Sequence, residues 1–252
     1  MIINDYNINY IDSGSGQAVL LLHGWGSNLK SFTSLINLLK TKYRVLALDY
    51  PGFGESDILK KSFTIDDYCD IVVEFLKNLE VKSVILVGHS YGGRIILKLN
   101  NRKNLPFSIE KNVLIDAAGL KDKKDLRIKL KVAAFKSLKY FFNLLPISKV
   151  KKDEMIKALR MKFGSSDYAN APKVLQDTLV KSVNEDLTWC LDNMKESLII
   201  WGDRDTVTPL WMAKLMETKI RNSGIVLLNG GHFSYLDDPV TFSKVMISYF
   251  NL

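Results

Sequence analysis

The sequence places one serine where it could act as a nucleophile. Ser90 is the centre of the pattern G-H-S-Y-G at residues 88–92, which directly follows the apolar run 84–87. Residues 94–99 then show the apolar spacing of a helix. A buried strand, a sharp turn and a helix around G-x-S-x-G are typical of a nucleophile elbow, in which the glycines tolerate close approach of the neighbouring backbone. The pattern predicts a nucleophilic Ser90; the alternative is a glycine-rich turn whose serine only caps the helix.

A serine hydroxyl is a weak nucleophile unless a base takes its proton. The chain has three histidines. His89 adjoins Ser90, so the turn should direct its side chain elsewhere, and His23 follows the first buried strand. His232 lies in a glycine-flanked loop after the last predicted strand. Because the carboxyl ends of parallel strands meet at one edge of a sheet, this loop can reach the elbow. We therefore predict His232 as the base; the alternative is a loop histidine with no partner.

The base needs a carboxylate that fixes its tautomer and stabilises the imidazolium. Two aspartates follow the penultimate predicted strand, and Asp205 is farther from that strand than Asp203. We favour Asp205, since Asp203 suits turn hydrogen bonds or a local pair with Arg204. Asp116, at the end of its own strand, is a third candidate. The chain order of nucleophile, acid and base is the order described for this elbow.

An acyl-transfer intermediate also needs two donors for its oxyanion. We expect these to be the backbone N–H groups of Tyr91, directly after the nucleophile, and of Trp25, in the loop after the first buried strand. His23 and Gly24, in that same loop, are candidates for contact with a substrate. Arg94, one turn into the helix after Ser90, could face a substrate carboxylate. For Arg94 a surface salt bridge is the favoured alternative.

Composition bounds the class of protein. The chain has 252 residues, of which 47% are hydrophobic and 25% charged, enough for one large α/β domain with an insertion or for two small domains. It contains no apolar run near the ~20 residues of a membrane span and no pattern of a signal peptide. Two distant cysteines without a C-x-x-C pattern suit a reducing compartment. We expect a cytoplasmic protein that needs neither a metal nor an organic cofactor.

Strand and helix patterns alternate along most of the chain. After a hairpin at residues 1–12, buried strands are predicted at 18–22, 43–48, 84–87, 112–116, 197–201 and 224–228. Helices are predicted at 29–40, 64–79, 94–99, 209–220 and 238–250, and Thr64 and Asp67 should cap the second of these. Such alternation predicts an α/β fold with a mostly parallel sheet covered on both faces.

This alternation stops between residues 119 and 185, where we predict helices at 126–145, 152–161 and 174–183. The segment holds 16 Lys or Arg and 7 Asp or Glu, so its net charge is +9. Such a surface could attract acidic substrates, nucleic acid or anionic lipid; a solvated lysine-rich surface is the favoured interpretation. Residues 124–145 could form an interfacial helix on anionic lipid. We prefer a lid over the site, and expect neither a nucleic-acid partner nor stable membrane insertion.

Five motifs together resemble the α/β-hydrolase fold enzymes. They are His23-Gly24-Trp25-Gly26, residues 49–56, residues 88–93, residues 202–209 and Gly230-Gly231-His232-Phe233. The resemblance implies an eight-stranded sheet with a helical lid inserted after the sixth strand. It implies a core domain of residues 1–118 and 186–252 with residues 119–185 as the lid. It also strengthens Asp205 over Asp203. A serine nucleophile argues against the dehalogenase and epoxide hydrolase branches, which need an aspartate.

The resemblance and the motifs predict a serine hydrolase, similar to carboxylesterases, that cleaves a small-molecule carboxylic ester. One alternative is a carbon–carbon bond hydrolase of ring-fission-type diketone acids, which a substrate carboxylate held by Arg94 or a lid lysine would support. Another is a non-catalytic ligand-binding or scaffold protein of the same fold. A third is a protein that binds an acidic macromolecule through the basic lid. We expect a monomer or a homodimer.

Overall fold

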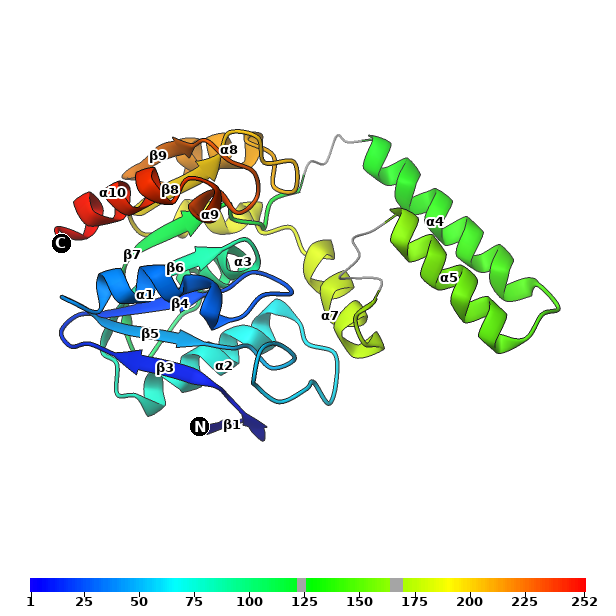
Figure 1. Ribbon diagram of the computed structural model, residues 1–252, viewed down its shortest axis with the longest axis horizontal. Coiled ribbons are helices and arrows are strands. Elements are labelled where there is room, and N and C mark those ends of the chain that lie inside the picture. The colour runs from blue at the N-terminus through cyan, green and yellow to red at the C-terminus, as the bar shows by residue number, and fades with distance from the viewer. Residues whose placement is uncertain (122–125, 164–169) are drawn as a thin grey trace.

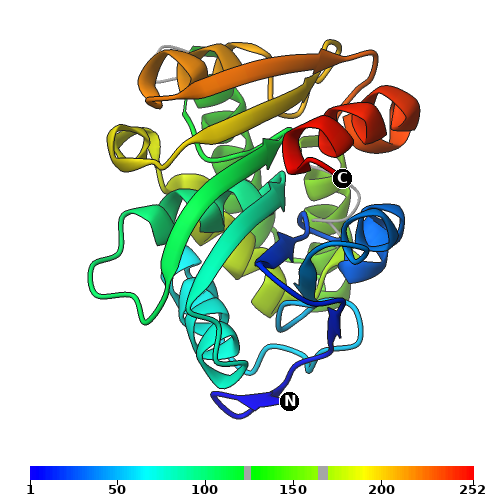
Figure 2. The same ribbon diagram turned by 90° about the vertical axis from the view of Figure 1, so that its left-hand side faces the viewer.

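The structure is a computed structural model that describes residues 1–121, 126–163 and 170–252, and its centre is a twisted, mostly parallel sheet (Figures 1 and 2). In the described residues this sheet has seven strands in the order β3-β5-β4-β6-β7-β8-β9. Only the pair β3–β5 is antiparallel. The strands are β3 (Tyr10–Ser13), β4 (Ala18–Leu22), β5 (Arg44–Leu48), β6 (Ser83–His89), β7 (Ser108–Ile115), β8 (Ser197–Gly202) and β9 (Ser223–Leu228). The predicted α/β fold is confirmed.

The expectation of eight strands in one sheet is wrong for the described residues. The first strands, β1 (Ile2–Ile3) and β2 (Tyr6–Asn7), form a separate two-stranded ribbon. Asn4 and Asp5 join them with φ values of 47° and 63°, the left-handed backbone that a tight two-residue hairpin turn needs. The predicted hairpin at residues 1–12 is therefore confirmed only in part, because β3 pairs with β5 in the main sheet.

The central strands are apolar throughout because helices cover both faces of the sheet. Along β4, Leu20 and Leu22 pack in the core on one face, and Val19 and Leu21 pack on the other. The first face is covered by α2 (Ile65–Asn78), α3 (Tyr91–Asn100), η2 (Thr188–Asn193) and α8 (Trp211–Lys219). The second face is covered by η1 (Leu29–Phe32), α1 (Thr33–Leu39), α9 (Ser234–Asp237) and α10 (Pro239–Phe250). In Figure 2, α1 in blue and α10 in red lie on the same side of the sheet.

Local signals set the helix boundaries as the sequence predicts. Thr64 caps α2, since its side chain accepts a hydrogen bond from the Asp67 N–H while the Asp67 carboxylate accepts one from the Thr64 N–H. This reciprocal capping satisfies donors that the first helical turn would leave unpaired.

The inserted segment forms three described helices, α4 (Leu126–Leu144), α5 (Lys149–Phe163) and α7 (Lys173–Asn184). In Figure 1, α7 lies beside the core, whereas α4 and α5 lie side by side as a hairpin farther from the sheet. No helix in the described ranges is long and apolar enough to cross a membrane.

Candidate active site

Ser90 sits in the strained turn that the glycine pattern predicts. Its φ and ψ are 49° and −106°, between β6 and α3. A Cβ on Gly88 would lie 2.7 Å from the Ile96 side chain, and a Cβ on Gly92 would lie 2.1 Å from the Leu22 carbonyl oxygen. Only glycine fits at such close approaches, so these two positions allow the tight turn that presents Ser90 above the sheet.

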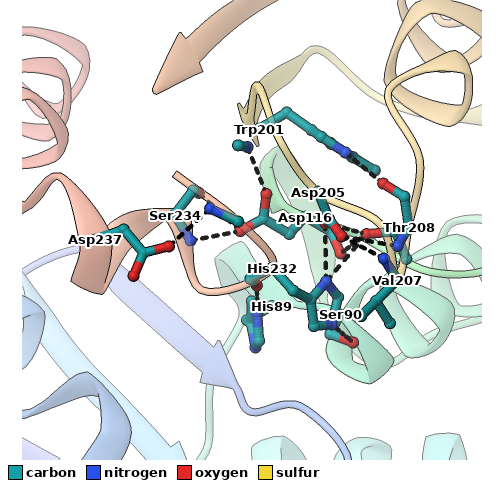
Figure 3. A network of polar contacts seen from close by, with 12 residues as sticks. His89, Ser90, Asp116, Trp201, Asp205, Val207, Thr208, His232, Ser234 and Asp237 are labelled. Carbon is teal, nitrogen blue, oxygen red and sulfur yellow. Dashed lines mark hydrogen bonds and ion pairs between the residues drawn. The ribbon is translucent and has the colours of Figure 1, made fainter. Parts of the chain in front are cut away.

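Three side chains from three loops meet in a hydrogen-bonded row (Figure 3). The Ser90 Oγ lies 2.8 Å from the His232 Nε2, and the His232 Nδ1 lies 2.8 Å from the Asp205 Oδ2. The side chain of Asp205 is fully buried, whereas that of His232 is 13% exposed. An Nδ1–H that donates to Asp205 leaves Nε2 as the acceptor for the Ser90 hydroxyl proton. This arrangement can activate a serine for acyl transfer.

The loop after β8 holds the Asp205 carboxylate with donors that favour its charged form. Asp205 Oδ1 accepts hydrogen bonds from the backbone N–H groups of Val207 and Thr208, and Oδ2 accepts one from the Thr208 hydroxyl at 2.6 Å. Burial alone would raise the pKa of Asp205, but the hydrogen bonds from His232 and Thr208 outweigh it, so the pKa is lowered. The sequence analysis missed Thr208; its position three residues after Asp205 is the local signal of such a turn.

The two competing aspartates do not reach His232. Asp203 accepts a hydrogen bond from the Gly230 N–H and lies 3.9 Å from the Arg204 guanidinium, the turn role expected for it. Asp116 is buried and accepts hydrogen bonds from Gly202 N–H and from both the N–H and hydroxyl of Ser234. Burial raises the pKa of Asp116 to about 6 against these hydrogen bonds. Asp116 thus joins the strand before Asp205 to the loop after His232.

The other two histidines support loops. The His89 Nε2 donates to the His232 carbonyl oxygen at 2.7 Å, so its ring points away from Ser90 as expected. The His23 Nδ1 donates to the Gly24 carbonyl oxygen, and its Nε2 accepts from the Tyr50 N–H. Burial lowers the pKa of His23 to about 4 and that of His89 to about 3. Both nitrogens of His23 are occupied and the ring is fully buried, which does not support the expected substrate contact.

A cavity of about 220 Å³ opens at Ser90. Trp25 and Tyr91, whose N–H groups we expect to hold an oxyanion, both line it. Tyr91 is the first residue of α3, and N–H groups in the first turn of a helix have no partner within the helix. Gly24 lies outside the lining, but a Cβ there would be 2.8 Å from the His89 Nδ1, so glycine lets this loop approach the elbow. The walls are mostly apolar: Ala118, Leu179, Val183, Val207 and Met212.

Arg94 also lines the cavity, and the expected surface salt bridge is wrong. The residue is only 7% exposed, and its Nη1 donates to the backbone carbonyl oxygens of Ser182 and Glu185 at the end of α7. Burial lowers the pKa of the guanidinium. The sequence could not predict this role, because Arg94 and its partners are about ninety positions apart.

Among the described residues no cluster of His, Cys, Asp or Glu could hold a metal ion. Cys69 and Cys190 are free thiols and both are buried. Burial raises the pKa of Cys190 to about 12 and that of Cys69 further, which disfavours a reactive thiolate at either position.

Comparison with known proteins agrees with the fold. A family model described as the alpha/beta hydrolase family matches residues 19–245. The chain belongs to this family. As an α/β hydrolase it is 28% identical to the uncharacterized hydrolase YugF of Bacillus subtilis, over 96% of this chain and 92% of that protein.

Two further similar proteins have names that state an activity. This α/β hydrolase is 27% identical to a pimeloyl-[acyl-carrier protein] methyl ester esterase of Wigglesworthia glossinidia brevipalpis, over 94% of this chain and 95% of that protein. It superimposes with a TM-score of 0.73 on an esterase from Exiguobacterium antarcticum, at 26% identity over 98% of this chain and 96% of that one.

Proposed function

We propose that this α/β hydrolase is a serine hydrolase that cleaves a small carboxylic ester through an acyl-enzyme on Ser90. The observation that carries the proposal is the row from Ser90 through His232 to Asp205, with both hydrogen bonds at 2.8 Å. The esterase names of two similar proteins support the same class of reaction. The proposal places the protein in a reducing compartment such as the cytoplasm, in keeping with its two unpaired cysteines.

In the proposed mechanism the Ser90 oxygen attacks the ester carbonyl carbon while His232 Nε2 takes the hydroxyl proton. Asp205 keeps Nδ1 protonated and stabilises the imidazolium. The N–H groups of Tyr91 and Trp25 stabilise the oxyanion of the tetrahedral intermediate. His232 then protonates the departing alcohol, and a water molecule activated by the same histidine hydrolyses the acyl-enzyme. No step requires a metal or an organic cofactor.

The size and walls of the cavity support a small substrate with an apolar acyl or alcohol part. Its volume of about 220 Å³ is below the ~300 Å³ at which typical ligand pockets begin. Leu179 and Val183 of α7 contribute apolar walls, together with Val207 and Met212. In this proposal α7 is the part of the predicted lid, residues 119–185, that shapes the site.

The first test is labelling with a fluorophosphonate probe, followed by a panel of p-nitrophenyl esters of increasing acyl length. We expect wild-type labelling that disappears in Ser90→Ala and in His232→Ala, and fastest turnover of short esters. Asp205→Asn should lower kcat about 10⁴-fold, whereas the matched variant Asp203→Asn should keep nearly wild-type kcat. A folded wild-type protein that neither reacts with the probe nor turns over esters would favour a ligand-binding member of the fold.

A second candidate function is hydrolysis of a carbon–carbon bond in a diketone acid. The buried guanidinium of Arg94 in the cavity wall favours it, because such a cation suits a substrate carboxylate. The test compares esters that carry a distal carboxylate with neutral esters of the same length, in wild type and in Arg94→Lys. A preference for the acids that Arg94→Lys loses would support this candidate, and indifference to the carboxylate would reject it.

A further inference from the structure

The hairpin of α4 and α5 contains an unusual basic segment. From residue 126 to residue 152 the chain has eight Lys or Arg and no Asp or Glu. None of the residues that line the cavity at Ser90 belongs to the described parts of α4 or α5. In the part of the hairpin that the structure describes, no residue lines the site, so the apolar lid face expected for residues 124–145 is not found there. Residues 124 and 125 lie outside the described residues.

Instead, α4 presents apolar side chains to solvent. Leu130 is 69% exposed, Phe141 56% and Leu144 64%. With Ala134 and Ser137, these residues recur at steps of three and four, so they share one face of the helix. A continuous exposed apolar face of this kind marks an interaction surface.

This face is not the one that holds the hairpin together. Phe142, which lies off that face of α4, is half-buried, and Ile156 and Leu159 of α5 are buried. The Lys152 Nζ donates to the Asn143 carbonyl oxygen at 2.8 Å and ties the two helices. The hairpin thus has its own packed interior and keeps a second, unpaired apolar face.

Exposed positive charges and an exposed aromatic ring also lie on the hairpin. Lys136 on α4 and Lys149 and Lys151 at the start of α5 are exposed. Val150, between the last two, is 68% exposed, and Tyr140 is 68% exposed. Exposed apolar side chains accompanied by lysines and a tyrosine suit a bilayer interface, where lysine stems bury among lipids and their charges meet anionic headgroups.

We propose that the exposed apolar residues of the hairpin, Leu130, Tyr140, Phe141, Leu144 and Val150, dock together with its exposed lysines, reversibly, on an anionic lipid bilayer. An acidic protein or a nucleic acid would satisfy the charges but would not need the apolar face. A neutral apolar partner would not need a segment free of acidic residues. An anionic bilayer can bind both the positive charges and the exposed apolar side chains. The proposal does not depend on the proposed esterase activity, because binding is measured without turnover.

The test is co-sedimentation of the full chain with vesicles of phosphatidylcholine, with and without phosphatidylglycerol, at low and high salt. The charge variant is the triple substitution Lys136→Gln, Lys149→Gln and Lys151→Gln, which removes the three exposed lysines named above. Lys152 is left intact because it ties α4 to α5. The matched control removes the same charge from exposed positions on the core, Lys61→Gln, Lys103→Gln and Lys214→Gln. The apolar variant is Phe141→Ser with Leu144→Ser. Circular dichroism verifies that each variant is folded.

We expect wild type to bind the anionic vesicles and to dissociate at high salt. The charge variant should bind about 100-fold more weakly, since each lysine near the surface contributes about a fivefold factor. The apolar variant should also bind more weakly, and the core control should stay close to wild type.

Three results would overturn the proposal. One is no binding to anionic vesicles at low salt. Another is equal binding by the charge variant and the core control, which would locate the contact elsewhere. The third is a concentration-dependent dimer in light scattering that the apolar variant abolishes while vesicle binding is absent, which would assign the face to a second copy of this chain.

Discussion

The two described parts of the insertion, α7 and the α4–α5 hairpin, share a pattern of lysines and apolar residues but have different surroundings. Both combine lysines with apolar residues at helical spacing. Thr178 and Ser182 of α7 are fully buried, and Thr178 Oγ1 accepts a hydrogen bond from the Phe63 N–H of the core. The hairpin instead exposes Phe141 and Leu144. Apolar spacing thus predicts that a helix has an apolar face, but not what covers that face.

The surroundings of α7 differ from those of the hairpin because polar groups of the core hydrogen-bond to α7. The Ser182 hydroxyl lies 2.7 Å from the Tyr91 hydroxyl, and Arg94 donates to the carbonyl oxygens at the end of α7. A cation at the carboxyl end of a helix is favourable for the helix dipole as well. Since Tyr91 adjoins Ser90, the contacts that fix α7 also fix the cavity wall beside the candidate nucleophile.

Acid should have the largest effect on stability, through buried His23 in the core loop after β4 rather than through the exposed hairpin. His23 is buried and its pKa is lowered from 6.5 to about 4. The unfolded chain therefore binds a proton at His23 below pH 6.5 that the folded chain refuses. The contribution of His23 to the free energy of unfolding is therefore fully present above pH 6.5. It falls by about 3 kcal/mol as the pH drops toward 4.

Urea unfolding at pH 7 and pH 4 measures this effect in wild type and in His23→Asn. We expect the variant to be less stable at pH 7 but to lose about 3 kcal/mol less than wild type on acidification. Equal losses in the two proteins would show that burial of His23 is not the cause.

Removing the anchor of α7 should have the next largest effect. Arg94→Met leaves the carbonyl oxygens of Ser182 and Glu185 without their charged donor. We expect a loss of about 2 kcal/mol of unfolding free energy, with a raised KM for esters because α7 forms the cavity wall. Lys139→Met on α4 is the hairpin counterpart and should change stability by less than ~0.5 kcal/mol. Equal effects of the two substitutions on thermal unfolding would show that α7 is not anchored more strongly than the hairpin.

Removing a buried hydroxyl from α7 should destabilise the protein more than removing an exposed hydroxyl from α4, although by less than the loss of Arg94. Thr178→Val removes the acceptor for the Phe63 N–H and should cost about 1 kcal/mol. Ser137→Val, on the exposed face of α4, should be nearly neutral. Denaturant unfolding of the pair would contradict this account if Ser137→Val were the more destabilising change.

The amino-acid sequence alone was enough to predict the parallel sheet and the loops that carry the candidate site. Runs such as 18–22 and 84–87 must be buried on both faces, and the carboxyl ends of parallel strands share one edge. Ser90, His232 and Asp205 follow three such strands, so their meeting follows from topology. The glycines at 88 and 92 add a local constraint that only a tight turn explains.

The partners of the remaining polar groups became known only from the folded arrangement of the chain. The sequence left Asp203 and Asp116 open as acids, and gave no sign that Asp116 joins Gly202 to Ser234. It also left Arg94 between a substrate contact and a surface pair. These outcomes depend on distances between segments far apart in the chain, which hydrophobic spacing does not encode. For the same reason the sequence predicted the helices of the insertion but not that α7 alone among the described ones lines the cavity.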